Sequence, residues 1–282
     1  MKVIIPCAGI GKRLLPITYS TPKQLIPIAN KPLIYYTIEF LIEAGIKDIC
    51  IVVNSDNLNI FKSKLEHFQH INITYKTQEN PLGIGDAILS AEEFTEGEPF
   101  LVILGDNIFH INLYEFIHNY FKDNSHCKIL LSEVENTRDY GVCYVSNGKV
   151  VNVIEKPIIS KSKLAITGLY MFDSKIFEGL REIKPSQRGE YEITDGIKWL
   201  IEKEFEVSYE IIHGKWRDIG KPEDVINENA YILKNFKNEI KGQVNSSSVQ
   251  GNMFLGTDSV LESSIIRGPV CIGKNTHIEK SY

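Results

Sequence analysis

The sequence predicts an α/β protein with a Rossmann-like sheet, mixed but mostly parallel and flanked by helices, followed by a short hexapeptide-repeat β-helix. Short apolar runs rich in β-branched residues alternate with helical patterns, as in sheets whose strands are buried on both faces. Towards the C-terminus an apolar residue recurs at every sixth position, which is typical of a β-helix. From this change in pattern we expect one large domain over residues 1–240 and a β-helix segment over residues 241–282.

The first half of the chain alternates strands and helices. The expected elements are, in order, a strand over 2–6, a helix over 31–45, a strand over 46–54, a helix over 83–94 and a strand over 99–107. In parallel sheets, ligands sit beyond the carboxyl ends of the strands. The turn at Gly9 and the carboxylate of Asp106 both fall at such ends.

The middle of the chain mixes antiparallel strands with one helix. Strands are expected over 128–134, 141–157, 165–173 and 207–212, with a helix over 192–204 between them. The last helix of the domain is expected after this part, over 221–236. Asn147-Gly148 interrupts the second of these strands and predicts a hairpin turn. This part of the chain should therefore add antiparallel strands to the sheet or beside it.

The six-residue period lies in the C-terminal segment. Its apolar positions are Phe254, Val260, Ile266, Ile272 and Ile278, and each is expected to point into a β-helix. A loose hairpin tail is the alternative, but five consecutive matches favour the β-helix. Its exposed edge predicts self-association.

Composition and charge limit the classes of protein to consider. A chain of 282 residues fits one large domain with an appendage, and 43% hydrophobic with 24% charged residues argues against a disordered or fibrous protein. The net charge of -5 argues against general nucleic-acid binding, which needs a basic excess.

The five cysteines and the N-terminus both favour a cytoplasmic protein. The cysteines are scattered without zinc or redox spacing, as expected for buried thiols in a reducing compartment. The apolar run at the N-terminus is stopped by Pro6 and Gly9, so it is too short for a signal peptide or a membrane span. We therefore expect no contact with a membrane.

A basic, glycine-rich turn follows the first predicted strand. Gly9 and Gly11 precede Lys12 and Arg13. Backbone N–H groups in such turns commonly hold a phosphate. Two familiar templates do not fit. The dinucleotide motif needs a third glycine where Leu14 stands, and the P-loop needs Ser or Thr where Arg13 stands.

Further motifs follow this turn in order. They are Pro22-Lys23, Pro27, Lys31-Pro32, LGDN at 104–107, YGV at 140–142, EKP at 155–157, TGLY at 167–170, RGEYEITD at 188–195 and WRDIG at 216–220. Together they resemble the sugar-phosphate nucleotidyltransferases, most closely the longer glucose-1-phosphate thymidylyltransferases with a C-terminal left-handed β-helix. The resemblance covers most of the chain and implies a nucleotidyltransferase fold, with residues 1–240 as the catalytic domain. Lys12 departs from the family, in which most members have Thr.

The resemblance implies that glucose 1-phosphate attacks the α-phosphate of dTTP, giving dTDP-glucose and pyrophosphate. A phosphate monoester loses its second proton near pH ~6, so the attacking oxygen is already an anion and needs no general base. Catalysis should then consist of positioning and charge neutralisation. Mg2+ is the expected cofactor, because phosphates and carboxylates suit this ion.

The family's functional residues map onto this sequence position by position. By resemblance the catalytic residues are Arg13 on the β and γ phosphates, Lys23 on the α-phosphate and Lys156 on the sugar phosphate, and the metal ligands are Asp106 and Asp218. The implied nucleotide-binding residues are Ala8, Gly9, Gly11, Arg13, Gln24, Gln78, Gly83 and Asp106. The implied sugar-phosphate-binding residues are Tyr140, Gly141, Glu155, Lys156, Thr167, Gly168, Arg188 and Glu190.

Without the family, five of these positions have ordinary interpretations. Asp106 would cap a turn, Gln78 would be a loop residue, and Arg188 would be a loop arginine. Glu155 and Lys156 would form an exposed ion pair of little energetic value.

Three alternative functions stay open. Gln24 and the LGDN motif favour dTTP, but UTP presents nearly the same edge to Gln78 and lacks only a methyl group worth about 1 kcal/mol. A nucleotide-sugar binding protein without turnover is disfavoured by the intact carboxylates, and a Rossmann oxidoreductase by Leu14. The predicted partners are dTTP or UTP and glucose 1-phosphate, with no nucleic acid, no membrane and a homo-oligomeric state.

Overall fold

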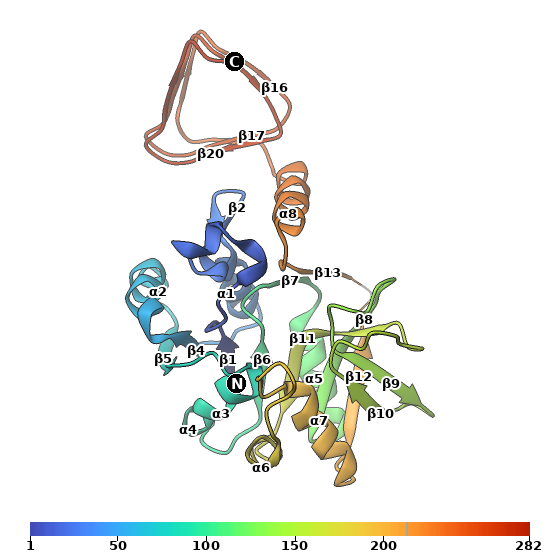
Figure 1. Cartoon of the computed structure of the whole chain (residues 1–282). Helices are drawn as coiled ribbons and strands as arrows, with labels where there is room; N and C mark the ends of the chain where they lie inside the picture. Colours follow the sequence, from blue (N-terminus) through green and yellow to red (C-terminus); the bar gives the residue numbers. More distant parts are fainter. Residues whose placement is uncertain (213) are drawn as a thin grey trace.

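The computed structural model describes residues 1–212 and 214–282. A large α/β body, built around a twisted sheet, leads through a final helix into a triangular coil of short strands (Figure 1). The chain therefore has the α/β architecture with a β-helix that the sequence predicts.

The main sheet has nine strands. They are β1 (Lys2–Pro6), β4 (Asp48–Asn54), β5 (Asn72–Gln78), β6 (Phe100–Ile103), β8 (Cys127–Glu133), β9 (Val142–Ser146), β10 (Lys149–Ile154), β11 (Leu164–Phe172) and β12 (Val207–Ile211). The order is β10-β9-β11-β6-β1-β4-β5, and β8 pairs with β11 and β12. Strands β5, β4, β1 and β6 are parallel, whereas β11 runs antiparallel to both β6 and β8. The sheet is thus mixed, with its parallel part at the N-terminal end of the chain.

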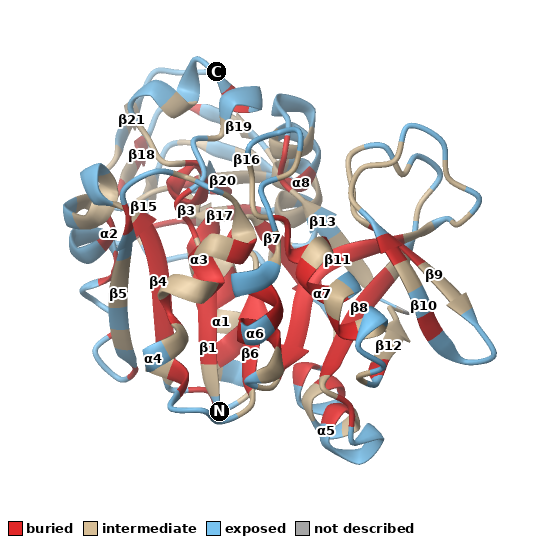
Figure 2. Ribbon diagram, turned by 60° about the horizontal axis from the view of Figure 1, so that its bottom comes forward, coloured by how far each residue is buried: buried red, intermediate tan, exposed pale blue. Residues whose placement is uncertain are grey.

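Helices cover both faces of this sheet. One face packs against α1 (Leu33–Glu43), α2 (Leu58–Leu65) and α5 (Leu113–Asp123), and the other against α3 (Ile84–Ser90), α4 (Glu92–Thr95), α6 (Lys175–Glu182) and α7 (Ile193–Glu202). In β1, Val3 and Ile5 enter the first core and Ile4 enters the second. Side chains alternate between faces along a strand, so a strand covered on both sides must be apolar throughout. The central strands are accordingly buried (Figure 2).

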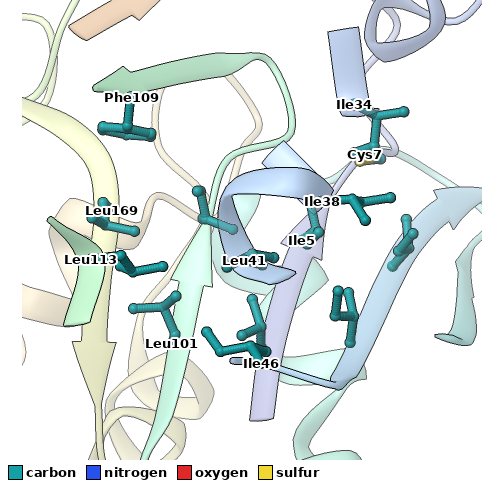
Figure 3. Close-up of a cluster of buried hydrophobic side chains, with 14 of the residues drawn as sticks. Ile5, Cys7, Ile34, Ile38, Leu41, Ile46, Leu101, Phe109, Leu113 and Leu169 are labelled. Carbon is teal, nitrogen blue, oxygen red and sulfur yellow. The ribbon is translucent and has the colours of Figure 1, made fainter. Parts of the chain in front are cut away.

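Helix α1 shows how the apolar period builds the first core. Ile34, Ile38 and Leu41 are fully buried, and they lie beside Ile5 and Leu101 of the sheet (Figure 3). Each buried side chain of this size contributes about 1.5–3 kcal/mol.

The observed elements differ from the predicted ones in several places, among them strand β5, which was not predicted. The helix expected over 83–94 is broken at Ala91, whose backbone N–H bonds to Ile88 and closes a tight turn between α3 and α4. Helices α2 and α6 were not predicted, because their short apolar stripes lie between polar stretches. The hairpin at Asn147-Gly148 is confirmed, with φ values of 50° and 76° that suit a primed turn.

Further elements lie outside the main sheet. They are η1 (Lys12–Leu14), η2 (Ile17–Tyr19), η3 (Lys23–Leu25), β2 (Pro27–Ile28), β3 (Lys31–Pro32), η4 (Ser55–Asn57), β7 (Asn107–His110), β13 (Lys215–Asp218) and α8 (Pro222–Lys234). Strands β7 and β13 pair antiparallel as a separate ribbon. The β2–β3 hairpin contacts both α8 and the coil, since the Ala29 N–H donates to Asn229 of α8 and the Asn30 amide donates to the Cys271 carbonyl of the coil.

The coil consists of strands stacked in three small parallel sheets. They are β14 (Glu239–Ile240), β15 (Gln243–Asn245), β16 (Ser248–Gln250), β17 (Met253–Leu255), β18 (Val260–Glu262), β19 (Ile265–Arg267), β20 (Val270–Ile272) and β21 (His277–Glu279). Val260 pairs with Gln243 and with His277, so neighbouring coils are offset by 17 residues. Three strict hexapeptides would instead give a repeat one residue longer.

This register corrects two predicted inward positions. Leu261, not Val260, is buried in the coil, and Met253 and Leu255 replace Phe254, whose ring stacks outside on Phe236. The other three predicted positions belong to the coil's core as expected. Self-association through the coil stays a prediction.

Two further expectations concern the cysteines and the membrane. All five cysteines have free thiols, four of them buried and Cys271 half-buried. Among residues 1–212 and 214–282, no helix combines the length and apolar character needed to cross a bilayer.

Candidate active site

A cavity of about 640 Å³ opens at the carboxyl ends of β1 and β5, within the size range of small-molecule sites. Segments far apart in the sequence meet there. The lining residues used below are Ala8, Gly9, Gly11, Lys12, Arg13, Lys23, Gln24, Gln78, Gly83, Asp106, Asp139, Lys156, Arg188, Glu190 and Gly220. All predicted nucleotide-binding residues are among them.

The basic turn forms one wall of this cavity. Gly11 has φ +70°, and a Cβ there would lie 3.0 Å from Thr18 Cγ2 and 3.2 Å from Lys23 Cβ. A residue without a side chain therefore lets the turn fold closely onto Lys23. The Thr18 hydroxyl donates to the Gly11 carbonyl at 3.0 Å and fixes this fold, while Arg13 stays exposed towards the cavity.

Lys23 lies between two carboxylates. Its Nζ is 2.5 Å from Asp106 Oδ2 and 3.9 Å from Asp218 Oδ1, and only 7% of the residue is exposed. Burial disfavours the charged ammonium, but Asp106 and Asp218 outweigh burial and raise the pKa of Lys23. The lysine is therefore a fixed positive charge at neutral pH.

The β7–β13 ribbon brings the two carboxylates together. Asp218 pairs with Asn107 across the ribbon, and the Ile219 N–H donates to the Asp106 carbonyl at 3.0 Å. The Asn107 amide donates to Asp106 Oδ1 at 2.7 Å, and the Trp216 indole N–H donates to Asn107 at 2.6 Å. This chain of hydrogen bonds orients Asp106, a role that the sequence did not reveal for Asn107 and Trp216.

The same pair can hold a divalent cation. Burial, together with the nearby charge of Asp106, raises the pKa of Asp218 to about 6. The ionised form of Asp218 is therefore disfavoured at this position, and a further cation would stabilise it. The described residues contain no cluster of three or more His, Cys, Asp or Glu side chains suited to a metal. Two carboxylates nevertheless fit Mg2+, which binds through one or two carboxylates and completes its shell with water and substrate phosphates.

Lys156 and Arg188 supply positive charge on the sugar side. Lys156 follows β10 with φ 40°, an uncommon value for a residue other than glycine, and its Nζ lies 3.2 Å from Glu155 Oε1. Arg188 lies among three carboxylates, 3.3 Å from Glu155, 2.9 Å from Glu190 and 3.3 Å from Glu192.

Glu192 was not predicted as a site residue. It is buried, and its Oε1 accepts hydrogen bonds from Ser186 and Arg188. Burial, followed by the charge of Glu155, raises its pKa. Glu155 also accepts a hydrogen bond from Thr194 at 3.2 Å. Arg188 is therefore held by a built network and is not the free loop arginine of the simpler interpretation.

Five predicted sugar-phosphate-binding residues do not line the cavity, namely Tyr140, Gly141, Glu155, Thr167 and Gly168. The Thr167 hydroxyl donates to the Leu130 carbonyl at 2.9 Å and is buried, and its role in sugar binding stays a prediction. The Tyr140 carbonyl accepts from the Lys156 N–H at 3.1 Å and so positions Lys156. The roles of Tyr140, Gly141 and Gly168 in sugar binding stay predictions.

Two buried glutamines also line the cavity. Gln78 is the last residue of β5 and is buried, so the loop interpretation is corrected. Its amide nitrogen donates to Asp86 and, at 3.4 Å, to the Gly83 carbonyl. Gln24 is buried with its Oε1 lacking a hydrogen-bond partner among the described residues. A buried acceptor without a donor is costly, and a ligand N–H could satisfy it.

Asp139 and Lys221 also stand at this site, although no sequence pattern singled them out. Asp139 lines the cavity and forms ion pairs with Arg13 and Lys221.

Fold and site together define an α/β phosphate-handling protein that binds its ligands at the carboxyl ends of the parallel strands, with lysine and arginine side chains beside a carboxylate pair. Residues 2–235 match the nucleotidyl transferase family, and the chain belongs to that family.

Curated relatives agree with this assignment. The chain is 35% identical over 259 residues to the low-salt glycan biosynthesis nucleotidyltransferase Agl11 of Haloferax volcanii, covering 90% of this chain and 72% of that protein. It is 33% identical over 285 residues to a glucose-1-phosphate thymidylyltransferase of Streptomyces griseus, covering 100% of this chain and 80% of that protein.

Solved structures share the fold. A crystal structure from Bacillus anthracis, provisionally described as a glucose-1-phosphate thymidylyltransferase, superposes with a TM-score of 0.78 and 34% identity, covering 85% of this chain and 98% of that one. A UDP-glucose pyrophosphorylase complexed with UDP-glucose gives a TM-score of 0.75 and 30% identity, covering 83% of this chain and 99% of that one.

Proposed function

We propose that the protein transfers a nucleoside monophosphate from dTTP to glucose 1-phosphate, forming dTDP-glucose and pyrophosphate. The observation that carries this proposal is the meeting of Arg13, Lys23 and Lys156 around one cavity, beside the carboxylate pair. Two polyanions must approach each other in this reaction. The protein provides one cation for the sugar phosphate, one for the α-phosphate and one for the β and γ phosphates.

In the proposed reaction, a phosphate oxygen of glucose 1-phosphate forms a bond to the α-phosphorus of the triphosphate. The bond between the α-phosphorus and its bridging oxygen to the β-phosphate breaks, and pyrophosphate leaves with that electron pair. Lys156 holds the attacking phosphate, Lys23 neutralises the α-phosphate, and Arg13 holds the β and γ phosphates. Their contribution is positioning and electrostatic stabilisation, because the nucleophile is already ionised.

Mg2+ would be held by Asp106 and Asp218. When bound, it would neutralise phosphate charge as a Lewis acid. Lys23 currently balances both carboxylates, so it would turn from them towards the α-phosphate when another cation is present.

The choice between dTTP and UTP depends on the part of the cavity that Gln24 and Gln78 line. The relatives named thymidylyltransferase support dTTP, whereas the likeness to the UDP-glucose pyrophosphorylase supports UTP as the second candidate. Because Gln78 donates its amide hydrogens to Asp86 and Gly83, its oxygen is left as the acceptor for a base N–H. Both pyrimidines offer that N–H, so discrimination rests on one methyl group and should be modest.

The deciding experiment is pyrophosphate release from glucose 1-phosphate with Mg2+, comparing dTTP and UTP, with a chelator control. We expect chelator-sensitive release that is faster with dTTP. Faster release with UTP would retain the mechanism and reverse the base assignment. Absence of release with either nucleotide would instead favour a nucleotide-sugar binding protein without turnover.

A further inference from the structure

One carboxylate at the mouth of the cavity joins two cations from distant parts of the chain. Asp139 accepts a hydrogen bond from Lys221 Nζ at 2.7 Å and lies 3.4 Å from Arg13 Nη1. Arg13 belongs to η1, Asp139 to the connection between β8 and β9, and Lys221 precedes α8. The hydrogen bond from Lys221, with the charges of Lys221 and Arg13, lowers the pKa of Asp139, so this carboxylate is ionised at neutral pH.

Arg13 is held in this position by close backbone contact. A Cβ on Gly220 would lie 3.0 Å from Arg13 Nη2 and 3.3 Å from Asp218 Oδ2. The guanidinium therefore lies against the backbone just before Lys221 and beside the predicted metal pair. Arg13, Asp139 and Gly220 line the cavity, and Lys221 adjoins them through its contact with Asp139.

Arg13 and Lys221 both bind the Asp139 carboxylate, and the same two cations can bind another anion. A carboxylate offers two oxygens to its donors, and a phosphate group offers oxygens to the same kinds of donor. The side chains of Arg13, Lys221 and Asp139 are 47%, 47% and 38% exposed, so a ligand can reach all three. A polyphosphate and the Asp139 carboxylate cannot share the two cations without strong repulsion.

We propose that Lys221 is a further phosphate-binding residue, and that Asp139 is a positioning residue which holds Arg13 and Lys221 until the terminal phosphates displace it. This inference rests on the proposed function, because it takes Arg13 to be a ligand of the β and γ phosphates. Asp139 keeps the two side chains ordered before the ligand binds. It also competes with pyrophosphate for them, which favours release of that product.

The proposal places Asp139 next to the sugar side as well. Asp139 directly precedes Tyr140, whose carbonyl accepts a hydrogen bond from the Lys156 N–H. Displacement of Asp139 by the terminal phosphates would therefore move the segment that positions the sugar-phosphate lysine.

The test uses pyrophosphate with Mg2+, since this product is common to dTTP and UTP, and measures its binding to the full-length protein by calorimetry. Lys221→Met should weaken binding about three- to fivefold, the worth of one exposed ion pair. Asp139→Asn should strengthen binding by a similar factor. If Asp139 had only a structural role, Asp139→Asn would weaken pyrophosphate binding. The direction of the change in affinity therefore distinguishes the proposed role from a purely structural one.

Conservative variants and salt provide the controls. Lys221→Arg and Asp139→Glu should bind like the wild-type protein, and each variant should keep the wild-type melting temperature. The dependence of binding on salt concentration should become shallower in Lys221→Met, because one fewer cation contacts the ligand.

The outcomes distinguish this inference from the proposed function. If the wild-type protein binds pyrophosphate but Lys221→Met binds it equally well, or Asp139→Asn binds it more weakly, the inference is wrong and the proposed function stands. If the wild-type protein binds no pyrophosphate with Mg2+, both are wrong.

Discussion

Replacing Lys23 by methionine tests how the cavity balances its charges. Methionine would retain the apolar packing of the lysine stem, but Asp106 and Asp218 would face each other without a cation. The ammonium that is lost lies 2.5 Å from one carboxylate and 3.9 Å from the other. The folded protein should therefore be less stable in the absence of a metal.

The size of the effect follows from these distances. With an effective dielectric constant of ~20, Coulomb's law gives gross attractions of about 7 and about 4 kcal/mol. Desolvation of the buried ammonium offsets much of this, so the expected net loss is that of a broken buried ion pair, about 3–5 kcal/mol.

The loss should depend on pH. The pKa of Asp218 is raised to about 6, and removal of Lys23, which favours the ionised form, raises it further. Below this pKa, Asp218 is protonated in the folded state but is still ionised in the unfolded state. Protonation removes the repulsion between Asp218 and Asp106 and so stabilises the folded variant. The destabilisation of Lys23→Met should therefore be largest above the pKa of Asp218 in the variant, which lies above 6, and smaller below it.

Urea unfolding with a chelator, followed by tryptophan fluorescence, measures this change. Lys12→Met is the matched control, because it removes an exposed cation that lines the same cavity and should alter stability by less than about 0.5 kcal/mol. Mg2+ should restore stability to Lys23→Met, since a divalent cation would replace the ammonium, while turnover stays abolished because the α-phosphate has lost its lysine.

Two results would refute the reasoning. A loss of less than about 1 kcal/mol relative to the Lys12→Met control would show that Lys23 does not neutralise the pair. Failure of Mg2+ to stabilise Lys23→Met would show that the pair does not hold the metal.

Three further substitutions separate the parts of the molecule. Asp106→Asn should lower turnover by about a hundredfold or more and raise the Mg2+ requirement in a pyrophosphate-release assay, and an unchanged Mg2+ dependence would contradict its assignment. Lys156→Met should raise KM for glucose 1-phosphate and leave KM for the triphosphate nearly constant; the opposite pattern in steady-state kinetics would reverse the pocket assignment. Leu261→Ala, at a fully buried position of the coil, should cost about 2–5 kcal/mol in urea unfolding without altering kcat, and a matching loss of kcat would tie the coil to the chemical step.

The sequence by itself determined the elements of the fold and the chemical character of the turn. The continuous apolar run of β1, the period of α1 and the Asn147-Gly148 turn are local patterns, and each depends on residues within a few positions. The basic turn around Arg13 was visible for the same reason. Family motifs then identified Lys23, Asp106, Lys156 and Asp218 as candidates.

The tertiary structure decided which of these side chains meet and which do not. The pairing of β7 with β13 places Asp218 beside Asp106, and chain folding joins Asp139 to Arg13 and Lys221. The buried Thr167 hydroxyl and the 17-residue offset of the coil likewise depend on packing partners distant in sequence. Contacts of this kind form only when long loops close, and a local pattern carries no information on which distant residue will be opposite.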